Sequence, residues 1–137
     1  MRAWLNGRLL EDAGEAALSV LDHGLTVGDG VFETVKAVDG QPFALTRHLS
    51  RLARSAQGLG LPAPDEVRVR EAVTTVLDGI SSATGRVRIT VTGGPGPLGS
   101  DRGDDVLEHL AVLTALDRGY VGADQLDPVA FQHAPLV

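Results

Sequence analysis

Cysteine is absent from the 137 residues. Its absence excludes disulfide bonds, thiolate catalysis and zinc sites built on cysteine. No apolar run approaches the roughly 20 residues that a membrane-spanning helix needs. Residues 1–4 also lack the apolar region of a signal peptide. We therefore expect a protein of the cytoplasm that has no membrane partner.

Positive charge and metal-binding patterns are also scarce. The formal net charge is −6, which gives no electrostatic reason to expect a nucleic-acid partner. The histidines show neither the HExxH pattern nor a paired spacing, so no metal site is expected. They are His23, His48, His109 and His133. Lysine occurs once, at Lys36.

The residues that are present indicate one globular domain. A length of 137 residues suits a single domain, and a hydrophobic content of 43% is normal for a packed core. Asn6-Gly7 and Asp39-Gly40 are each flanked by apolar runs, which predicts two β-hairpins. Strands are predicted by alternation of polar and apolar residues. Their ranges are 3–5, 8–10, 18–21, 31–38, 86–92, 109–114 and 129–132.

Residues 22–60 hold the most distinctive part of the chain. A glycine-rich turn over residues 22–30 precedes the strand at 31–38, and a second apolar run follows at 42–45. Thr46 is the predicted N-cap of a helix, and Gly58 is predicted to lie just past its end. The apolar stripe of this helix is predicted to comprise Leu49, Leu52, Ala53 and Ala56.

A second helix is predicted after the stiff link at residues 61–64. Asp65 is its expected N-cap, and Gly79 its expected stop. Its predicted apolar face comprises Val67, Val69, Val73, Val76 and Leu77. Strands interrupted by two helices predict an α+β fold in which the helices pack on one face of a mostly antiparallel sheet.

Three motifs carry a resemblance to a known family. They are Asp22-His23-Gly24, Gly28-Asp29-Gly30-Val31-Phe32-Glu33-Thr34 and His48-Leu49-Ser50-Arg51-Leu52. In this order and spacing the sequence resembles the N-terminal part of class IV, fold-type IV pyridoxal-phosphate enzymes. That family includes branched-chain and D-amino-acid aminotransferases and aminodeoxychorismate lyase. The resemblance implies the family's small N-terminal domain at residues 1–116, a divergent or truncated interdomain segment at 117–137, and an absent catalytic C-terminal domain.

The resemblance implies pyridoxal 5′-phosphate as the cofactor and Arg51 as the residue that contacts its phosphate. Arg51 matches the arginine of the family's HxxRL motif, and a planar guanidinium offers a phosphate two parallel donors. The alternative is a solvated arginine on the polar face of an amphipathic helix, beside Arg47 and Arg54. We expect His48 to support Arg51 rather than to transfer protons.

The resemblance also implies residues on the substrate side. Phe32 and Lys36 match strand positions that face the substrate, and Arg88 falls near the position that meets its carboxylate. The alternatives are a core Phe32, an exposed Lys36 and an exposed strand face around Arg88. Val27 stands where relatives carry an aromatic residue that closes the neighbouring subunit's pocket, which implies a homodimer.

Two departures from the family pattern bear on the substrate, and the first is Val27 in place of an aromatic residue. The D-amino-acid aminotransferase pattern has an arginine and a histidine in the loop after the strand, where this chain has Leu98 and Ser100. A D-amino-acid substrate is therefore disfavoured.

Neither glycine-rich segment, 28–30 or 93–96, is a nucleotide-binding loop, because neither matches GxxxxGK[ST] nor leads directly into a helix.

The activity implied by the resemblance is that of a transaminase or lyase. Its substrates would be amino acids and 2-oxo acids, or 4-amino-4-deoxychorismate. In the family, the Schiff-base lysine lies in the following domain, and Lys36 on its early strand is not assigned that role. We therefore expect the chain alone to be inactive. The alternatives are a non-catalytic dimerising module or a truncated gene product.

Overall fold

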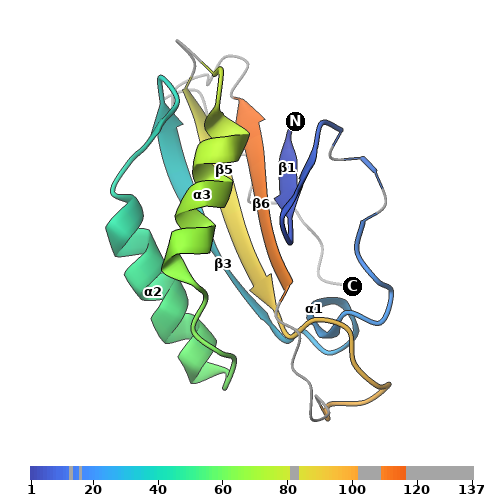
Figure 1. Ribbon diagram of the computed structural model, residues 1–137. Helices are drawn as coiled ribbons and strands as arrows, with labels where there is room; N and C mark the ends of the chain where they lie inside the picture. Colours follow the sequence, from blue (N-terminus) through green and yellow to red (C-terminus); the bar gives the residue numbers. More distant parts are fainter. Residues whose placement is uncertain (13, 16, 81–83, 102–108, 117–137) are drawn as a thin grey trace, which may run out of the picture.

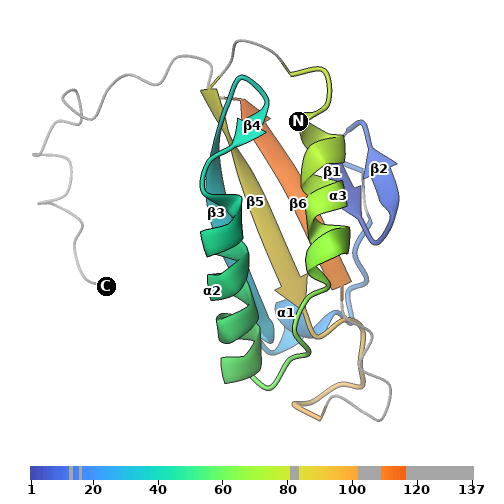
Figure 2. The same ribbon diagram turned by 60° about the vertical axis from the view of Figure 1, so that its left-hand side comes forward.

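A single antiparallel sheet dominates the molecule, and two long helices cover one of its faces (Figures 1 and 2). The computed structural model describes all residues except 13, 16, 81–83, 102–108 and 117–137. Within the described residues the sheet has six strands, in the order β2-β1-β6-β5-β3-β4. The strands are β1 (Ala3–Leu5), β2 (Arg8–Leu10), β3 (Gly30–Val38), β4 (Gln41–Pro42), β5 (Thr84–Thr92) and β6 (His109–Leu116).

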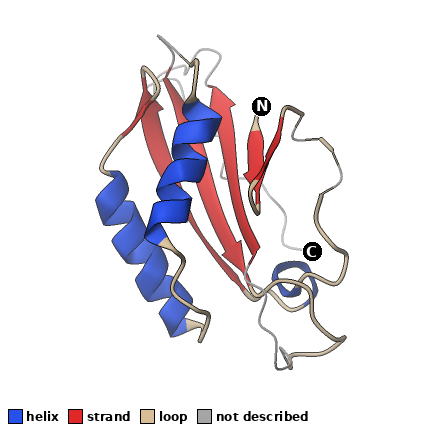
Figure 3. Cartoon of the chain, viewed as in Figure 1, coloured by secondary structure: helices blue, strands red, loops and turns tan. Residues whose placement is uncertain are grey.

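The helices are α1 (His23–Thr26), α2 (Leu45–Gly58) and α3 (Glu66–Leu77). Helix α2 packs on β3, and α3 packs on β6 and β1, so both long helices lie on the same side of the sheet (Figures 2 and 3). The predicted α+β fold is thereby confirmed. The four-residue helix α1 was not predicted, because the segment 22–30 was expected to be a turn throughout.

Both predicted hairpins form. Asn6 and Gly7 have φ values of 49° and 101°, and Asp39 and Gly40 have values of 49° and 72°. Positive φ at both central residues suits the twist of the flanking strands, which explains the choice of Asn-Gly and Asp-Gly. The second apolar run is shorter than predicted, because β4 ends at Pro42 rather than continuing over 42–45.

The predicted ends of α2 are wrong by one or two residues. Its N-cap is Ala44, which has a left-handed backbone with a φ of 52° and makes no side-chain cap bond. Thr46 lies inside the helix, where its hydroxyl accepts a hydrogen bond from Arg70 at 2.8 Å. Gly58 is the last helical residue, and the left-handed residue beyond the end is Gly60, with a φ of 68°.

The second helix begins as predicted. The Asp65 carboxylate accepts hydrogen bonds from the backbone N–H groups of Val67 and Arg68, at 2.9 and 3.2 Å. Val67 itself is exposed, which corrects its predicted place on the apolar face. The core lies between the two long helices and the sheet. Its fully buried members include Leu52, Val69, Ala72, Val73, Val76, Val35, Val87, Ile89 and Val91.

Three further predictions meet different outcomes. The strand predicted at 18–21 does not form, because Ser19 and Asp22 make a turn there and Val20 is 78% exposed. The strand predicted at 86–92 begins two residues earlier, at Thr84. The strand at 129–132 and the segment 117–137 lie outside the described residues. No helix within the described part is both long enough and apolar enough to cross a bilayer.

Candidate functional site

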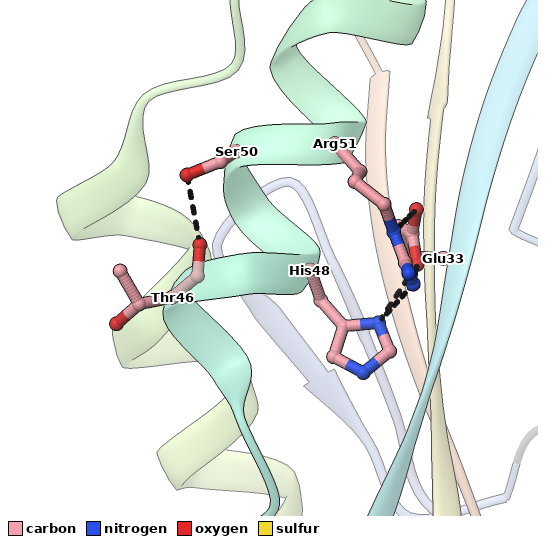
Figure 4. Close-up of polar contacts among 5 residues, drawn as sticks. All are labelled: Glu33, Thr46, His48, Ser50 and Arg51. Atoms are coloured by element: carbon pink, nitrogen blue, oxygen red, sulfur yellow. Dashed lines mark hydrogen bonds and ion pairs between the residues drawn. The ribbon is translucent and has the colours of Figure 1, made fainter.

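One cluster of polar side chains joins β3 to α2. Glu33 projects from β3 towards the helices, because side chains alternate along a strand and its neighbour Phe32 faces the other way. His48 and Arg51 are three residues apart on α2 and therefore share one helix face. Figure 4 shows both side chains directed at Glu33.

The arginine and the glutamate form a bidentate ion pair. Arg51 Nε donates to Glu33 Oε1 at 3.0 Å, and Arg51 Nη2 donates to Glu33 Oε2 at 2.7 Å. His48 Nδ1 lies 2.7 Å from Glu33 Oε2. Paired parallel hydrogen bonds of this kind fix the orientation of a guanidinium as well as its distance. The expectation that His48 supports Arg51 is consistent with these contacts.

The carboxylate decides the tautomer of His48. Its Nδ1 is 2.9 Å from Arg51 Nη2 as well as 2.7 Å from Glu33. An arginine nitrogen can only donate, and an ionised carboxylate can only accept. A proton on Nδ1 makes a charge-assisted bond to Glu33, whereas a lone pair there would face a carboxylate oxygen. Nδ1 therefore carries the proton, and its closeness to Nη2 results from sharing one oxygen.

The cluster keeps Glu33 ionised. The hydrogen bond from Arg51 lowers the pKa of the Glu33 carboxyl below 4.5; burial opposes this shift, and the bond from His48 adds to it. The Glu33 side chain is 13% exposed, whereas that of Arg51 is 53% exposed. The pair is thus an inward-facing anion with a cation at the surface, and the pKa of Arg51 is raised by the same bond.

The other predicted strand residues lie on the open face of the sheet. Phe32 and Lys36 are exposed on β3, and Arg88 is exposed on the neighbouring β5. The Arg88 guanidinium carbon is 3.7 Å from the centroid of the Phe32 ring, which is a cation–π contact. The predicted alternation along β3 is confirmed, and Phe32 is not a core residue here.

Arg51 and these open-face residues are therefore separated by the sheet. The two sides meet at the edge of the sheet, because β3 is the last strand but one. It pairs with β5 along its whole length but with β4 only at Ala37 and Val38. Among the described residues, the first part of β3 thus has one unpaired edge. A ligand at that edge would lie between the helix face and the open face.

The Asp22-His23-Gly24 motif fastens the two glycine-rich loops together. Asp22 is 2% exposed; its carboxylate accepts from Gly24 N at 2.8 Å and from Thr92 Oγ1 at 2.9 Å. His23 is 1% exposed, and its Nε2 lies 3.0 Å from Pro97 O, so Nε2 carries the donated proton. No role was predicted for His23 from the sequence, although its place in the Asp22-His23-Gly24 motif could have indicated one.

The close approach of the two glycine-rich loops also explains why residue 96 is a glycine. A Cβ atom at Gly96 would lie 2.4 Å from His23 Nε2.

Val27, the predicted contact to a neighbouring subunit, is the C-cap of α1 and is 43% exposed. The structure thus brings together Glu33, His48 and Arg51 on one side and Phe32 and Arg88 on the other. It leaves Val27 apart from both groups.

Comparison with known proteins identifies the family. The model of the family described as amino-transferase class IV matches residues 30–121. The chain belongs to the class IV aminotransferases. A putative branched-chain-amino-acid aminotransferase of Methanocaldococcus jannaschii is 39% identical over 104 residues, which are 74% of this chain and 35% of that relative.

Other class IV relatives differ in their reactions. Aminodeoxychorismate lyase of Bacillus subtilis is 34% identical over 94 residues, covering 66% of this chain and 32% of the relative. The PLP-bound form of a hypothetical aminotransferase from Mycobacterium tuberculosis superposes with a TM-score of 0.74 at 27% identity, covering 84% of this chain and 39% of that one. The class IV chain described here therefore spans about a third of the length of the curated relatives it matches.

Proposed function

We propose that this chain provides the phosphate-binding part of a pyridoxal-phosphate site in a class IV aminotransferase or aminodeoxychorismate lyase. The observation that carries the proposal is Arg51. It lies in the His48–Leu52 motif and is held by Glu33 on one edge, while its side chain is 53% exposed. A surface arginine that is both oriented and accessible suits the recognition of a phosphate.

The donor set of Arg51 fits a phosphate group. A guanidinium has five N–H donors, and Glu33 takes one on Nε and one on Nη2. Among the described residues, Nη1 has no partner. Its two donors remain for a ligand, whereas Nη2 also lies 2.9 Å from His48 Nδ1. Pyridoxal phosphate, when bound, would supply an electron-withdrawing ring for chemistry at an amino acid's α-carbon.

Exposed cations on the open face support a carboxylate-bearing substrate. Arg88 contacts Phe32, and Lys36 is exposed further along the same face of β3. Amino acids and 2-oxo acids both carry a carboxylate that such cations can bind. We assign Lys36, Arg88 and Phe32 to the substrate side, across the β3 edge from Arg51. The 4-amino-4-deoxychorismate of the lyases would be recognised through its carboxylates in the same way.

The proposed setting is a homodimer in the cytoplasm. Val27 and the apolar residues before it are exposed at one end of the molecule, which suits a contact with a second subunit. The complete lack of cysteine is compatible with a reducing compartment. Val27 would then meet the substrate pocket of that neighbour.

A non-catalytic dimerising module is the second candidate. It is favoured by the position of Lys36, which is the one lysine of the sequence and faces away from Arg51. In that case the 137 residues would hold a phosphate and associate, but would carry out no amino-group chemistry.

The test is the binding of pyridoxine 5′-phosphate, which lacks the reactive aldehyde. We expect Arg51→Ala to weaken binding by about tenfold or more, because hydrogen bonds between charged groups are the strong ones. Arg54→Ala is the matched control, because Arg54 is exposed on the same helix and makes no hydrogen bond or ion pair in the described part of the chain. Equal effects of the two substitutions would refute the assignment of Arg51.

A further inference from the structure

Glu33 contacts no ligand in the function proposed above, yet it is the side chain of the cluster with the most hydrogen bonds. Its side chain is 13% exposed, and both of its oxygens accept hydrogen bonds. One oxygen is shared by Arg51 and His48. A carboxylate enclosed in this way has little freedom to rotate, so it can serve as a fixed point for the arginine.

Arg51 needs such a fixed point, because its side chain is long and half exposed. The neighbouring arginines of α2 show the contrast. Arg47 and Arg54 are exposed and make no hydrogen bond or ion pair among the described residues. A flexible guanidinium must lose its rotamer freedom when it binds a ligand, and that loss weakens binding.

The geometry also determines which edge of Arg51 is left for a ligand. Glu33 binds the edge formed by Nε and Nη2. The outer edge, which carries Nη1, therefore points away from the carboxylate. Among the described residues the two Nη1 donors have no partner, whereas Nη2 lies between Glu33 and His48. An anion can bind this edge without breaking either bond to Glu33.

We propose that Glu33, braced by His48, is a positioning residue that clamps Arg51 by its inner edge and leaves the outer edge to a phosphate. The phosphate then adds to the ion pair instead of replacing it. This inference rests on the proposed function, because it assumes that Arg51 is the phosphate contact.

The negative charge of Glu33 also repels a phosphate, and this repulsion alone would weaken phosphate binding. The repulsion acts across the width of the guanidinium, whose positive charge lies between the two anions, and the phosphate would be on the side where Arg51 is open to solvent. The gain in orientation acts directly on the two donors that bind the ligand. We therefore expect the clamp to outweigh the repulsion.

Nuclear magnetic resonance of the ¹⁵N-labelled 137-residue chain tests the clamp directly. The Arg51 Nε–H signal should be protected from exchange with water, and Glu33→Gln should remove this protection. Titration with pyridoxine 5′-phosphate, and separately with inorganic phosphate, should leave the Nε–H signal protected at saturation while the Nη signals shift. Loss of that protection during the titration would show that phosphate displaces Glu33, and would overturn the proposal.

Affinity measurements on the variants give an independent readout. Glu33→Gln should weaken binding of pyridoxine 5′-phosphate by roughly two- to tenfold, as expected when one side chain must be ordered on binding. Glu66→Gln is the matched control, since Glu66 forms a comparable pair with Arg70 on α3. Unchanged or tighter binding by Glu33→Gln would contradict the proposal.

The histidine provides a conservative rescue. His48→Asn keeps a donor close to the position of Nδ1 and should retain both the protected signal and the affinity. His48→Leu removes the donor and should lose part of each. If Glu33→Gln does not fold, the wild-type titration and the His48 pair still decide the question. If Arg51→Ala binds phosphate as well as wild type, the proposed function fails. If Arg51→Ala binds weakly but Glu33→Gln binds normally, only the clamp fails.

Discussion

At the scale of single residues, the motif around Arg51 was identified from sequence, whereas the partner that orients it was not. Arg51 and His48 share a helix face, which the three-residue spacing predicts. Glu33 is 18 residues from Arg51 along the chain. Alternation along β3 put Glu33 opposite Phe32, but no local pattern tells which face of a strand a later helix will cover. The pairing therefore depends on tertiary packing.

The ion pair also makes a prediction about stability and pH. The pKa of Glu33 is lowered in the folded chain, first by Arg51. A lowered pKa means that the charged carboxylate stabilises the fold above its ordinary pKa of 4.5, and that this contribution is lost as the pH falls through the folded value. We expect wild type to be more stable than Glu33→Gln at neutral pH.

Urea unfolding of both chains from neutral pH down to about pH 3 measures this difference, because the other carboxyl groups titrate alike in the two chains. The gap in unfolding free energy should be constant at neutral pH and should close below about pH 4.5. A gap that is unchanged at the acid end would show that Glu33 stabilises the fold without its charge.

At the scale of elements, local chemistry predicted what depends on a few neighbouring residues. The Asn-Gly and Asp-Gly turns and the Asp65 cap formed as predicted, since each needs only its own backbone geometry. The start of α2 was missed because Ala44 adopts a left-handed conformation for which alanine has no preference. The strand predicted at 18–21 does not form, because apolar content alone does not supply a neighbouring strand.

The turn before β4 gives a prediction that depends on the backbone geometry of a single residue. Gly40→Ala should reduce the unfolding free energy by about 2 kcal/mol or more, because alanine disfavours positive φ and also meets a steric obstacle here. Gly40 has a φ of 72°, and an added Cβ would lie 2.6 Å from the carbonyl oxygen of Ile80.

The control is a glycine with neither restriction. Gly58 is the last residue of α2, and an added Cβ there would meet no atom within 4 Å. Gly58→Ala should cause no loss and should gain up to about 1 kcal/mol. Thermal and urea unfolding of the three chains measure both effects. Similar stability of Gly40→Ala and Gly58→Ala would mean that the turn can relax away from Ile80.

At the scale of the whole molecule, the sheet divides the candidate site into two parts. Sequence periodicity placed Phe32 and Lys36 on one face, and the structure agrees. It could not show that Arg51 would lie across the sheet from them, because that depends on which face α2 covers. A ligand that contacts both parts, as proposed, would have to lie at the edge of β3 that is unpaired among the described residues.

The last prediction follows from this division. Lys36 is the one lysine of the sequence, and its side chain is on the open face of β3. Amino-group transfer with pyridoxal phosphate needs an amine held at bonding distance from the cofactor's aldehyde. Arg51 lies on the helix-covered side of the sheet. A phosphate bound to it would not direct the cofactor's aldehyde towards Lys36. We therefore expect the 137-residue chain alone to show no transaminase turnover.

Borohydride reduction after mixing the chain with pyridoxal phosphate tests this expectation. Digestion should reveal no pyridoxyl label on Lys36 above the level found at the N-terminal amine of Met1. Lys36→Arg, which keeps the charge but lacks the amine, should bind pyridoxine 5′-phosphate as wild type does, because phosphate affinity is assigned to Arg51. A stoichiometric and saturable label on Lys36, accompanied by amino-group transfer that Lys36→Arg abolishes, would make Lys36 catalytic. It would also require the two faces to act as one site across the edge of β3.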